Sequence, residues 1–140
     1  SLRMPGTPDT HHTLTHEEPR DQALGYQPKA TFFVMKTMEA WTTFVKTLDA
    51  VPEGDGTLLD NCLVLAHSET SEANTHSVVG LPFMTAGTAG GNVKTGLHVS
   101  GIGESCSRVG LTMQQAMGLN VGQWGTDQNQ TDRTISEILS

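Results

Sequence analysis

The sequence is poor in positive charge and in long apolar runs, and these two shortages already restrict its function. Lysine and arginine total 8 against 15 aspartates and glutamates, a formal net charge of -7. Such a chain repels a phosphate backbone rather than attracting it, so we expect no nucleic-acid partner. No apolar run approaches the roughly 18 residues that a membrane-spanning helix requires, so we also expect no membrane span.

Cysteine is scarce as well. Cys62 and Cys106 are too few for a disulfide framework, and their separation does not fit a zinc site. Cys62 lies in an apolar run, where a free thiol behaves as a small buried hydrophobe. A disulfide between the two cysteines is the alternative in an oxidising compartment.

Residues 54–91 form the stretch around which the rest of the chain is organised. An apolar run at 62–66 is followed by a polar loop at 67–76 with two histidines and two glutamates, and then by a second apolar run at 81–86. A strand that is apolar at every position is typical of a parallel sheet covered on both faces. Sites in open α/β sheets collect at the carboxyl ends of such strands, so the sequence predicts a site in this loop.

The pattern predicts helices on both sides of these strands. Residues 28–50 begin with a proline, which suits a first helical turn, and carry apolar residues four, three, four and three apart. We expect this helix to pack its apolar face against a sheet. Residues 107–117 predict a weaker helix, 94–99 a short strand and 134–139 a last helical turn. The apolar stripe of the first helix comprises Val34, Met38, Trp41, Val45 and Leu48.

The chain divides into an extended, His-rich arm at 1–27 and an α/β segment at 28–140. The arm has little periodicity and is too short to bury a core of its own. Two or three strands with two helices do not close a parallel sheet, which needs helices on both faces. The segment therefore either forms a small lobe or completes a sheet whose other strands come from elsewhere. With Ser1 as its first residue and no signal-peptide pattern behind it, we expect a mature product or a piece of a longer chain.

Two groups of side chains are candidates for a site. His12 and His16 are spaced i, i+4, which on a helix places both imidazoles on one metal, but the threonine- and proline-rich flanks make a helix unexpected. The alternative is a polar surface segment. Glu69, Glu72 and His76 follow the predicted strand, and carboxylate with imidazole suits Zn, Mn or Fe, or general acid–base chemistry. The alternative is a solvated loop.

Other catalytic chemistry finds no support in the sequence. No Gly-x-Ser-x-Gly elbow is present, so nucleophilic acyl transfer is not indicated. The glycine-rich turn at 87–91 lacks the Lys-Ser/Thr of a phosphate loop and precedes no helical pattern. His67 directly follows the predicted strand and is a further candidate, whereas His98 is isolated and is interpreted as structural.

The order of several motifs resembles the C-terminal part of the HXXSHH family, a domain-of-unknown-function group of bacterial, usually exported proteins. Residues 12–17 match the motif that names the family, with Thr15 in place of serine and Glu17 in place of the final histidine. The resemblance extends from about His12 to Gly125. The other residues that carry it are 54–61, 63–65, Glu69, 74–77, 81–83, 86–87, 89–91, 94–96 and 116–119.

This resemblance implies a fold, a location and a partner. The family is similar to alkaline-phosphatase-like and sulfatase-like proteins, which have metals at strand ends. It implies a partial sandwich of that type, with short, mostly parallel strands, two helices and long loops. The nucleophile and first metal-binding aspartate of that superfamily lie in an N-terminal half. The resemblance therefore implies a periplasmic or secreted C-terminal segment whose partner is that half or another polypeptide that completes the sheet, with a homo-oligomer as the alternative.

Two functions follow as hypotheses. The first is a non-catalytic structural or binding component. The second is a C-terminal fragment of a metal-dependent hydrolase of phosphate or sulfate esters. In the second, His12, His16, Glu69 and His76 would be ligands of Zn, Mn or Fe, or acid–base groups. The hypotheses differ in whether His12, His16 and His76 converge on one point.

Overall fold

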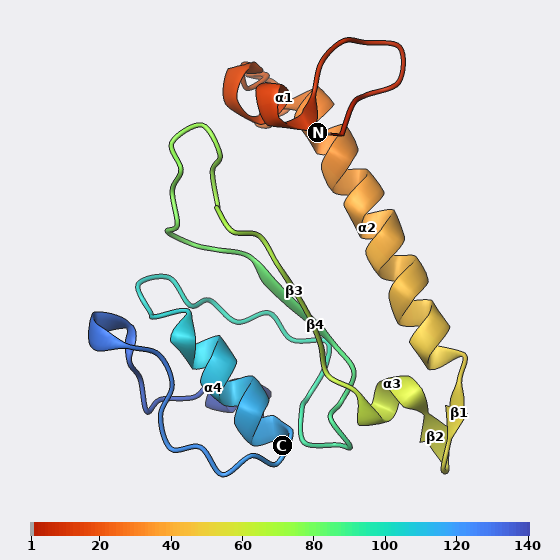
Figure 1. Ribbon diagram of the computed structural model, residues 1–140, viewed down its shortest axis with the longest axis vertical. Coiled ribbons are helices and arrows are strands. Elements are labelled where there is room, and N and C mark those ends of the chain that lie inside the picture. The colour runs from red at the N-terminus through yellow and green to blue at the C-terminus, as the bar shows by residue number, and fades with distance from the viewer. Residues whose placement is uncertain (1) are drawn as a thin grey trace.

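The computed structural model describes residues 2–140, which contain four α-helices and two separate two-stranded hairpins (Figure 1). The hairpins pair β1 (Pro52–Glu53) with β2 (Gly56–Thr57), and β3 (Val64–His67) with β4 (Phe83–Ala86). The α-helices are α1 (His11–Glu17), α2 (Pro28–Asp49), α3 (Leu58–Asn61) and α4 (Ser107–Ala116), and two 3-10 turns follow, η1 (Asp127–Asn129) and η2 (Ser136–Ile138).

The predicted partial alkaline-phosphatase-like sandwich of mostly parallel strands is wrong. Both apolar runs do form strands, but β3 and β4 are antiparallel, with Val64 opposite Ala86 and His67 opposite Phe83. A parallel pair needs a crossover connection, usually a helix. The connection at 68–82 contains no helix and folds back as a long loop, so the chain returns beside itself. No parallel pair occurs within residues 2–140.

The expectation that residues 12–16 are not helical is also wrong. The Oγ1 atom of Thr10 accepts a hydrogen bond from the backbone N–H of Thr13 at 3.2 Å and so caps the start of α1. At the other end, the Nε2 atom of Gln27 donates to carbonyl oxygens of the last turn and its cap. Seven residues are too few for a stable isolated helix, so this partner is needed. The carbonyls belong to Leu14, Thr15 and Glu18.

The long helix α2 forms as predicted, with proline in its first turn. Its amino end is capped by α1. Each carboxylate oxygen of Glu18 accepts one backbone N–H, from Lys29 and from Ala30, both at 2.8 Å. A carboxylate at this position also interacts favourably with the helix dipole. The two helices therefore cap each other, through Glu18 in one direction and Gln27 in the other.

The expectation that α2 packs on a sheet is wrong. It contacts α1 near its amino end and α3 near its carboxyl end. In Figure 1 the helix stands apart from β3 and β4 along most of its length. Val34 is 55% exposed and Phe44 49% exposed, although both lie on its apolar side. The sequence specified an amphipathic helix, but residues 2–140 supply no sheet beneath it.

The hydrophobic core is divided into two small clusters. The N-terminal cluster is formed by Leu14, Ala30 and Phe33, with Met4 and Phe32 against it. The C-terminal cluster is formed by Ala89, Val93 and Ala116, with Leu63 and Leu139 against it. The two clusters share no residue, so each end of the chain is stabilised by its own apolar contacts.

The glycine-rich turn after β4 wraps around the end of α3. The N–H groups of Ala89 and Gly90 donate to the carbonyl oxygens of Cys62 and Asp60, at 3.0 and 2.8 Å. Gly87 has a φ of 91°, and a Cβ atom there would overlap the carbonyl oxygen of Cys62. These N–H groups are occupied within the chain, which agrees with the interpretation that this turn is not a phosphate loop.

The remaining predictions are confirmed in part. Residues 107–117 do form a helix, α4, and 134–139 contain the single turn η2. The strand predicted at 94–99 is wrong, since this segment is irregular and its start, Lys94, donates its N–H to the carbonyl of Ile138 at 2.8 Å. Both cysteines are free thiols, so the alternative of a disulfide between them is not found.

No helix within residues 2–140 has the length and apolar character to cross a membrane.

Candidate functional site

A pocket of about 610 Å³ lies beyond the carboxyl end of β3. Its walls come from α1, the segment that connects α1 to α2, the first turns of α2 and the loop at 68–76. All four predicted site residues, His12, His16, Glu69 and His76, line it. Residues about 60 positions apart in the sequence thus face a common space.

The three histidines form a chain of ring contacts. The ring centroids of His12 and His16 are 4.7 Å apart, with an angle of 61° between the ring planes. Those of His16 and His76 are 5.2 Å apart, at 73°. The first contact arises because α1 is helical, and residues four apart lie on the same helix face. The second joins α1 to the loop, with His16 in the middle.

His76 is held at the pocket by an unusual backbone conformation. Its φ is 53°, in the left-handed region that few residues other than glycine adopt. The turn is closed by two bonds, from His76 N–H to the Ala73 carbonyl at 3.3 Å and from Ser77 N–H to the Glu72 carbonyl at 3.1 Å. Such a conformation persists only when the surrounding structure favours it, and it occurs often at binding sites.

Two of the three carboxylates in the pocket are already occupied. Glu18 accepts the two N–H groups of α2. Glu72 forms an ion pair with Arg20 at 3.3 Å and accepts a hydrogen bond from the Thr75 hydroxyl at 3.2 Å. Glu69 lines the pocket from the exposed loop. The pocket therefore offers imidazole nitrogens and the carboxylate of Glu69.

The side chains fit a divalent metal by their chemistry but not by their present orientation. Imidazole is a good ligand for Zn, Cu, Fe and Ni. Yet among residues 2–140 no three His, Cys, Asp or Glu side chains are arranged to hold a metal ion. The rings of His12, His16 and His76 meet edge to face, at 61° and 73° between the ring planes. The three rings are neighbours, but they do not form a finished metal site.

Of the other histidines, His11 also lines the pocket, whereas His67 and His98 do not. His67 stacks on Phe83 of β4, with centroids 5.6 Å apart, and its Nδ1 atom lies 3.3 Å from the Ser68 carbonyl oxygen. His98 lies on an exposed, irregular segment. His11 packs against Phe33 in the N-terminal cluster, at 4.9 Å between centroids. His67 does not line this pocket. Its role as a further site residue stays a prediction.

Sequence reasoning missed Arg20 and Tyr26, which also line the pocket. Both belong to the connection between α1 and α2, which has no periodicity. Arg20 reaches Glu72, fifty-two positions away in the sequence. No local pattern signals such a pair. The one signal in the sequence that could have pointed to Arg20 is its position close to His16, a residue that was already a candidate for the site.

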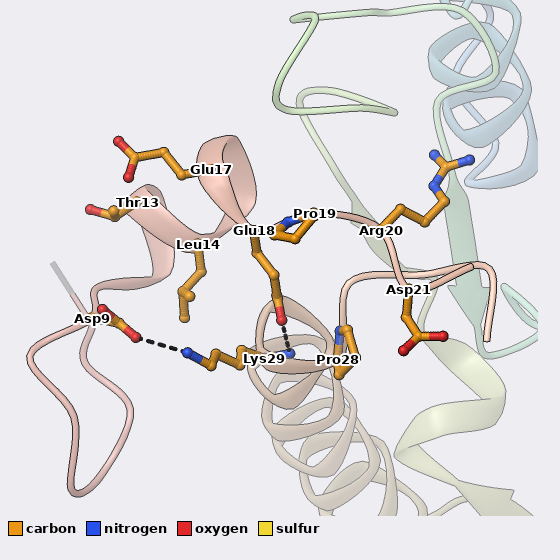
Figure 2. A pocket seen from close by; sticks show the side chains of 10 residues that line it. All are labelled: Asp9, Thr13, Leu14, Glu17, Glu18, Pro19, Arg20, Asp21, Pro28 and Lys29. Carbon is orange, nitrogen blue, oxygen red and sulfur yellow. Dashed lines mark hydrogen bonds and ion pairs between the residues drawn. The ribbon is translucent and has the colours of Figure 1, made fainter. Parts of the chain in front are cut away.

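A second pocket, of about 520 Å³, lies at the junction of α1 and α2 (Figure 2). Its charged groups are mostly paired with their neighbours. Lys29 is 3.3 Å from Asp9, and Glu18 points to the start of α2, as the dashed lines show. Asp21 accepts two backbone N–H groups of its own turn, at 2.8 Å each. These contacts indicate a structural junction, so the histidine pocket is the stronger candidate.

No protein-family model, no curated protein and no solved structure shows significant similarity to this chain. The resemblance to the HXXSHH family, with the location and partner that it implies, therefore stays a prediction from the sequence motifs.

Proposed function

We propose that this chain is a non-catalytic binding component of an exported bacterial protein of the HXXSHH type. In this proposal, it buries a large part of its surface against a polypeptide that completes the β3–β4 sheet. The histidine pocket is its ligand-binding site, and a divalent metal of the Zn, Mn or Fe group is the ligand.

The observation that carries the proposal is the large exposed surface of the chain. Its accessible surface is 9488 Å². A compact monomer of this mass exposes roughly 7,000 Å². The excess, about 2,400 Å², is as large as the share that one partner contributes to an obligate interface, where about 2,000–5,000 Å² is buried in total. An excess of this size supports the proposal that the chain buries surface against a partner.

The exposed apolar side chains indicate where that partner docks. The hairpin of β3 and β4 is an isolated two-stranded sheet, which is marginally stable in water. Leu65 of β3 is 36% exposed and Met84 of β4 is 38% exposed. Further strands added to this hairpin would satisfy its free edge groups, and the uncovered apolar side of α2 would gain a surface to pack on.

Hydrogen exchange on the isolated chain, combined with sedimentation velocity and a dye that binds apolar surface, tests this proposal. We expect amides of β3 to exchange quickly, dye to bind, and Leu65→Lys to reduce dye binding. Leu2→Lys is the matched control, because Leu2 is 70% exposed but lies far from the hairpin along the chain. A monomer with protected β3 amides and no dye binding would overturn the proposal.

The alternative is a fragment of a metal-dependent hydrolase of phosphate or sulfate esters. The observation in its favour is that imidazole and carboxylate side chains share one pocket at a strand end. Hydrolysis of a p-nitrophenyl phosphate or sulfate, measured with Zn²⁺ or Mn²⁺, tests it. Activity that is lost in His16→Ala and retained in His98→Ala would favour the hydrolase, whereas equal rates in both variants would reject it.

A further inference from the structure

We infer that Asn129 is an acceptor site for N-linked glycosylation, at which an oligosaccharyltransferase attaches a glycan to the exported protein. The site is the segment at 127–131, which reads Asp-Gln-Asn-Gln-Thr. This inference rests on the export that is part of the proposed function. It concerns a different part of the chain from the histidine pocket, and it adds a covalent modification.

The segment contains the acceptor pattern Asn-x-Ser/Thr, in which the middle residue is not proline. Asn129, Gln130 and Thr131 satisfy this pattern. Glycosylation of the pattern requires a surface loop in an exported protein, so the structure around Asn129 decides whether the match has a meaning. No other asparagine has serine or threonine two positions later, and these are Asn61, Asn74, Asn92 and Asn120.

Asn129 lies on an exposed turn with a well-defined backbone. Trp124 and Thr131 pair with each other, at 2.9 and 2.8 Å between N–H nitrogen and carbonyl oxygen, and so close the loop that contains η1. The backbone N–H of Asn129 donates to the Thr126 carbonyl at 2.9 Å, and its carbonyl accepts the Ser105 hydroxyl at 3.2 Å. All three residues of η1 are exposed. The turn therefore presents Asn129 at the surface.

The amide nitrogen of Asn129 is available for a reaction. The side-chain nitrogen of Asn61 donates to a carboxylate oxygen of Glu53 at 2.7 Å, and that of Asn92 donates to two backbone carbonyls at 2.9 Å each. For Asn129, the contacts found within residues 2–140 are those of its backbone. Its amide can therefore enter the active site of an enzyme without leaving a partner in the fold unsatisfied.

Two neighbouring side chains can be recognised together with the amide. The Oγ1 atom of Thr131 accepts the backbone N–H of Arg133 at 3.1 Å, and its hydroxyl keeps a proton to donate. Asp127 is exposed, with a φ of 50°, a conformation that aspartate tolerates. Its carboxylate, two positions before Asn129, offers a basic side chain of the enzyme a charged partner.

The reaction requires a lipid-pyrophosphate-linked oligosaccharide as the second substrate. The Nδ2 atom of Asn129 forms a bond to the anomeric carbon of the first sugar and loses one proton. The bond from that carbon to the pyrophosphate oxygen breaks, and the lipid pyrophosphate leaves with the electron pair and takes up the proton. No atom is oxidised or reduced in this transfer.

The position of the turn is compatible with the proposed partner. In Figure 1, η1 is the blue turn at the left of the view and α2 lies at the right, with β3 and β4 between them. A glycan is bulky and hydrophilic, and on η1 it is attached on the side away from α2. The uncovered apolar side of α2 therefore stays open for docking.

The first experiment is mass spectrometry of the protein purified from its native cells. We expect the intact mass to exceed the sequence mass by that of a glycan, and fragmentation of the tryptic peptide 109–133 to place this mass on Asn129. Asn120 is the internal control, because it is exposed and lies in the same peptide but lacks the pattern. An unmodified Asn129, or a glycan on Asn120 instead, would overturn the inference.

The second experiment incubates the full chain with a bacterial oligosaccharyltransferase and a lipid-pyrophosphate-linked oligosaccharide, and follows the intact mass. Asn129→Gln and Thr131→Ala should abolish the mass gain, whereas Thr131→Ser should retain it because serine also supplies a hydroxyl. Asn120→Gln is the matched control and should accept the glycan like the original chain. No transfer to the original chain, or transfer to Asn129→Gln, would contradict the assignment.

A further variant tests the carboxylate beside the acceptor. Asp127→Asn keeps a residue that tolerates the left-handed conformation and removes only the charge. We expect the rate of transfer, measured in the second experiment, to fall at least tenfold. An unchanged rate would overturn the role given to Asp127.

These measurements fail independently of the test of the proposed partner. Glycosylation is read from one asparagine on η1, whereas partner docking is read from β3 amides and dye binding. If Asn129 is modified while β3 is protected in the isolated chain, the partner proposal falls and the glycosylation inference stands. If β3 is labile and the native Asn129 is unmodified, the glycosylation inference falls alone.

Discussion

The two ends of the chain are stabilised in different ways. In the N-terminal region, α1 and α2 cap each other through Glu18 and Gln27. The small cluster around Phe33 lies at the same junction. Nearly all of these contacts join residues that are fewer than 30 positions apart.

The C-terminal region combines its own apolar cluster with side-chain-to-backbone hydrogen bonds that reach across loops. The Nη2 atom of Arg108 donates to the Thr134 carbonyl at 2.7 Å, and Asn92 donates to the Ala116 carbonyl at 2.9 Å. The Thr112 hydroxyl accepts the N–H of Ile135 at 2.8 Å. These bonds hold irregular segments against α4.

The two regions therefore have separate sources of stability. In one region the polar contacts are at helix ends, and in the other they are part-buried bonds from side chains to the backbone. The regions meet at two places, where α2 contacts α3 and where the loop at 68–76 lines the histidine pocket. A change in one region should therefore leave the other folded, and the following variants test this.

The largest effect is expected from Phe33→Ala and Leu111→Ala, one in each region. Phe33 is 6% exposed and Leu111 is fully buried. Removing such side chains costs about 2–5 kcal/mol. Hydrogen exchange should show that Phe33→Ala releases α1 and α2 while α4 stays protected, and the reverse for Leu111→Ala. If either variant unfolds both regions together, the chain has one cooperative core and the comparison is wrong.

Gly87→Ala should rank next, with a loss of about 3 kcal/mol in the free energy of unfolding, measured with urea. A Cβ atom would meet the backbone of Cys62, and the left-handed φ adds strain. Gly96→Ala is the matched control. Gly96 has a φ of 73° and open space around its Cβ position, so it should lose only about 1 kcal/mol. Equal losses would mean that the contact with Cys62 is unimportant.

Glu18→Gln should cost about 1–2 kcal/mol, because the amide replaces one of two charged acceptors at the start of α2. Circular dichroism during thermal unfolding would measure the loss. Glu39→Gln is the control, since Glu39 only pairs with Lys36 on the exposed side of the same helix, and it should change stability by less than about 0.5 kcal/mol. A larger effect at Glu39 than at Glu18 would contradict the mutual capping.

Arg20→Ala should have the smallest effect, below about 0.5 kcal/mol. It removes the exposed ion pair with Glu72, and such pairs stabilise little because water and salt screen them. Urea unfolding at low and high salt provides the measurement. A loss above 1 kcal/mol would show that the connection between the regions is stronger than its exposure indicates.

The regular elements could be predicted from the sequence where a local pattern determines them. The stripe from Val34 to Leu48 and the proline at position 28 predicted α2, and Val109 to Met117 predicted α4. The short helix α1 could not be predicted, because the groups that stabilise its end belong to Gln27 rather than to its own seven residues.

In the sheet and the site, too, local sequence patterns predicted some features, and residues far apart in the sequence determined the others. The runs at 62–66 and 81–86 predicted strands, but no local pattern fixes whether two strands run parallel, and the intervening loop determined the outcome. The site residues were chosen by chemical type, and all four line one pocket. Their orientation could not be predicted, because it depends on the φ of His76 and on Arg20–Glu72, a pair of side chains far apart in sequence.

The mutual caps of α1 and α2 have a consequence for the order of events as the chain folds. A seven-residue helix has no stable existence in water by itself, so His12 and His16 lie on one face only after Gln27 has reached the end of α1. The pair of imidazoles is thus absent until the start of α2 has formed. The face of α1 that lines the pocket is therefore completed only once the start of α2 is in place.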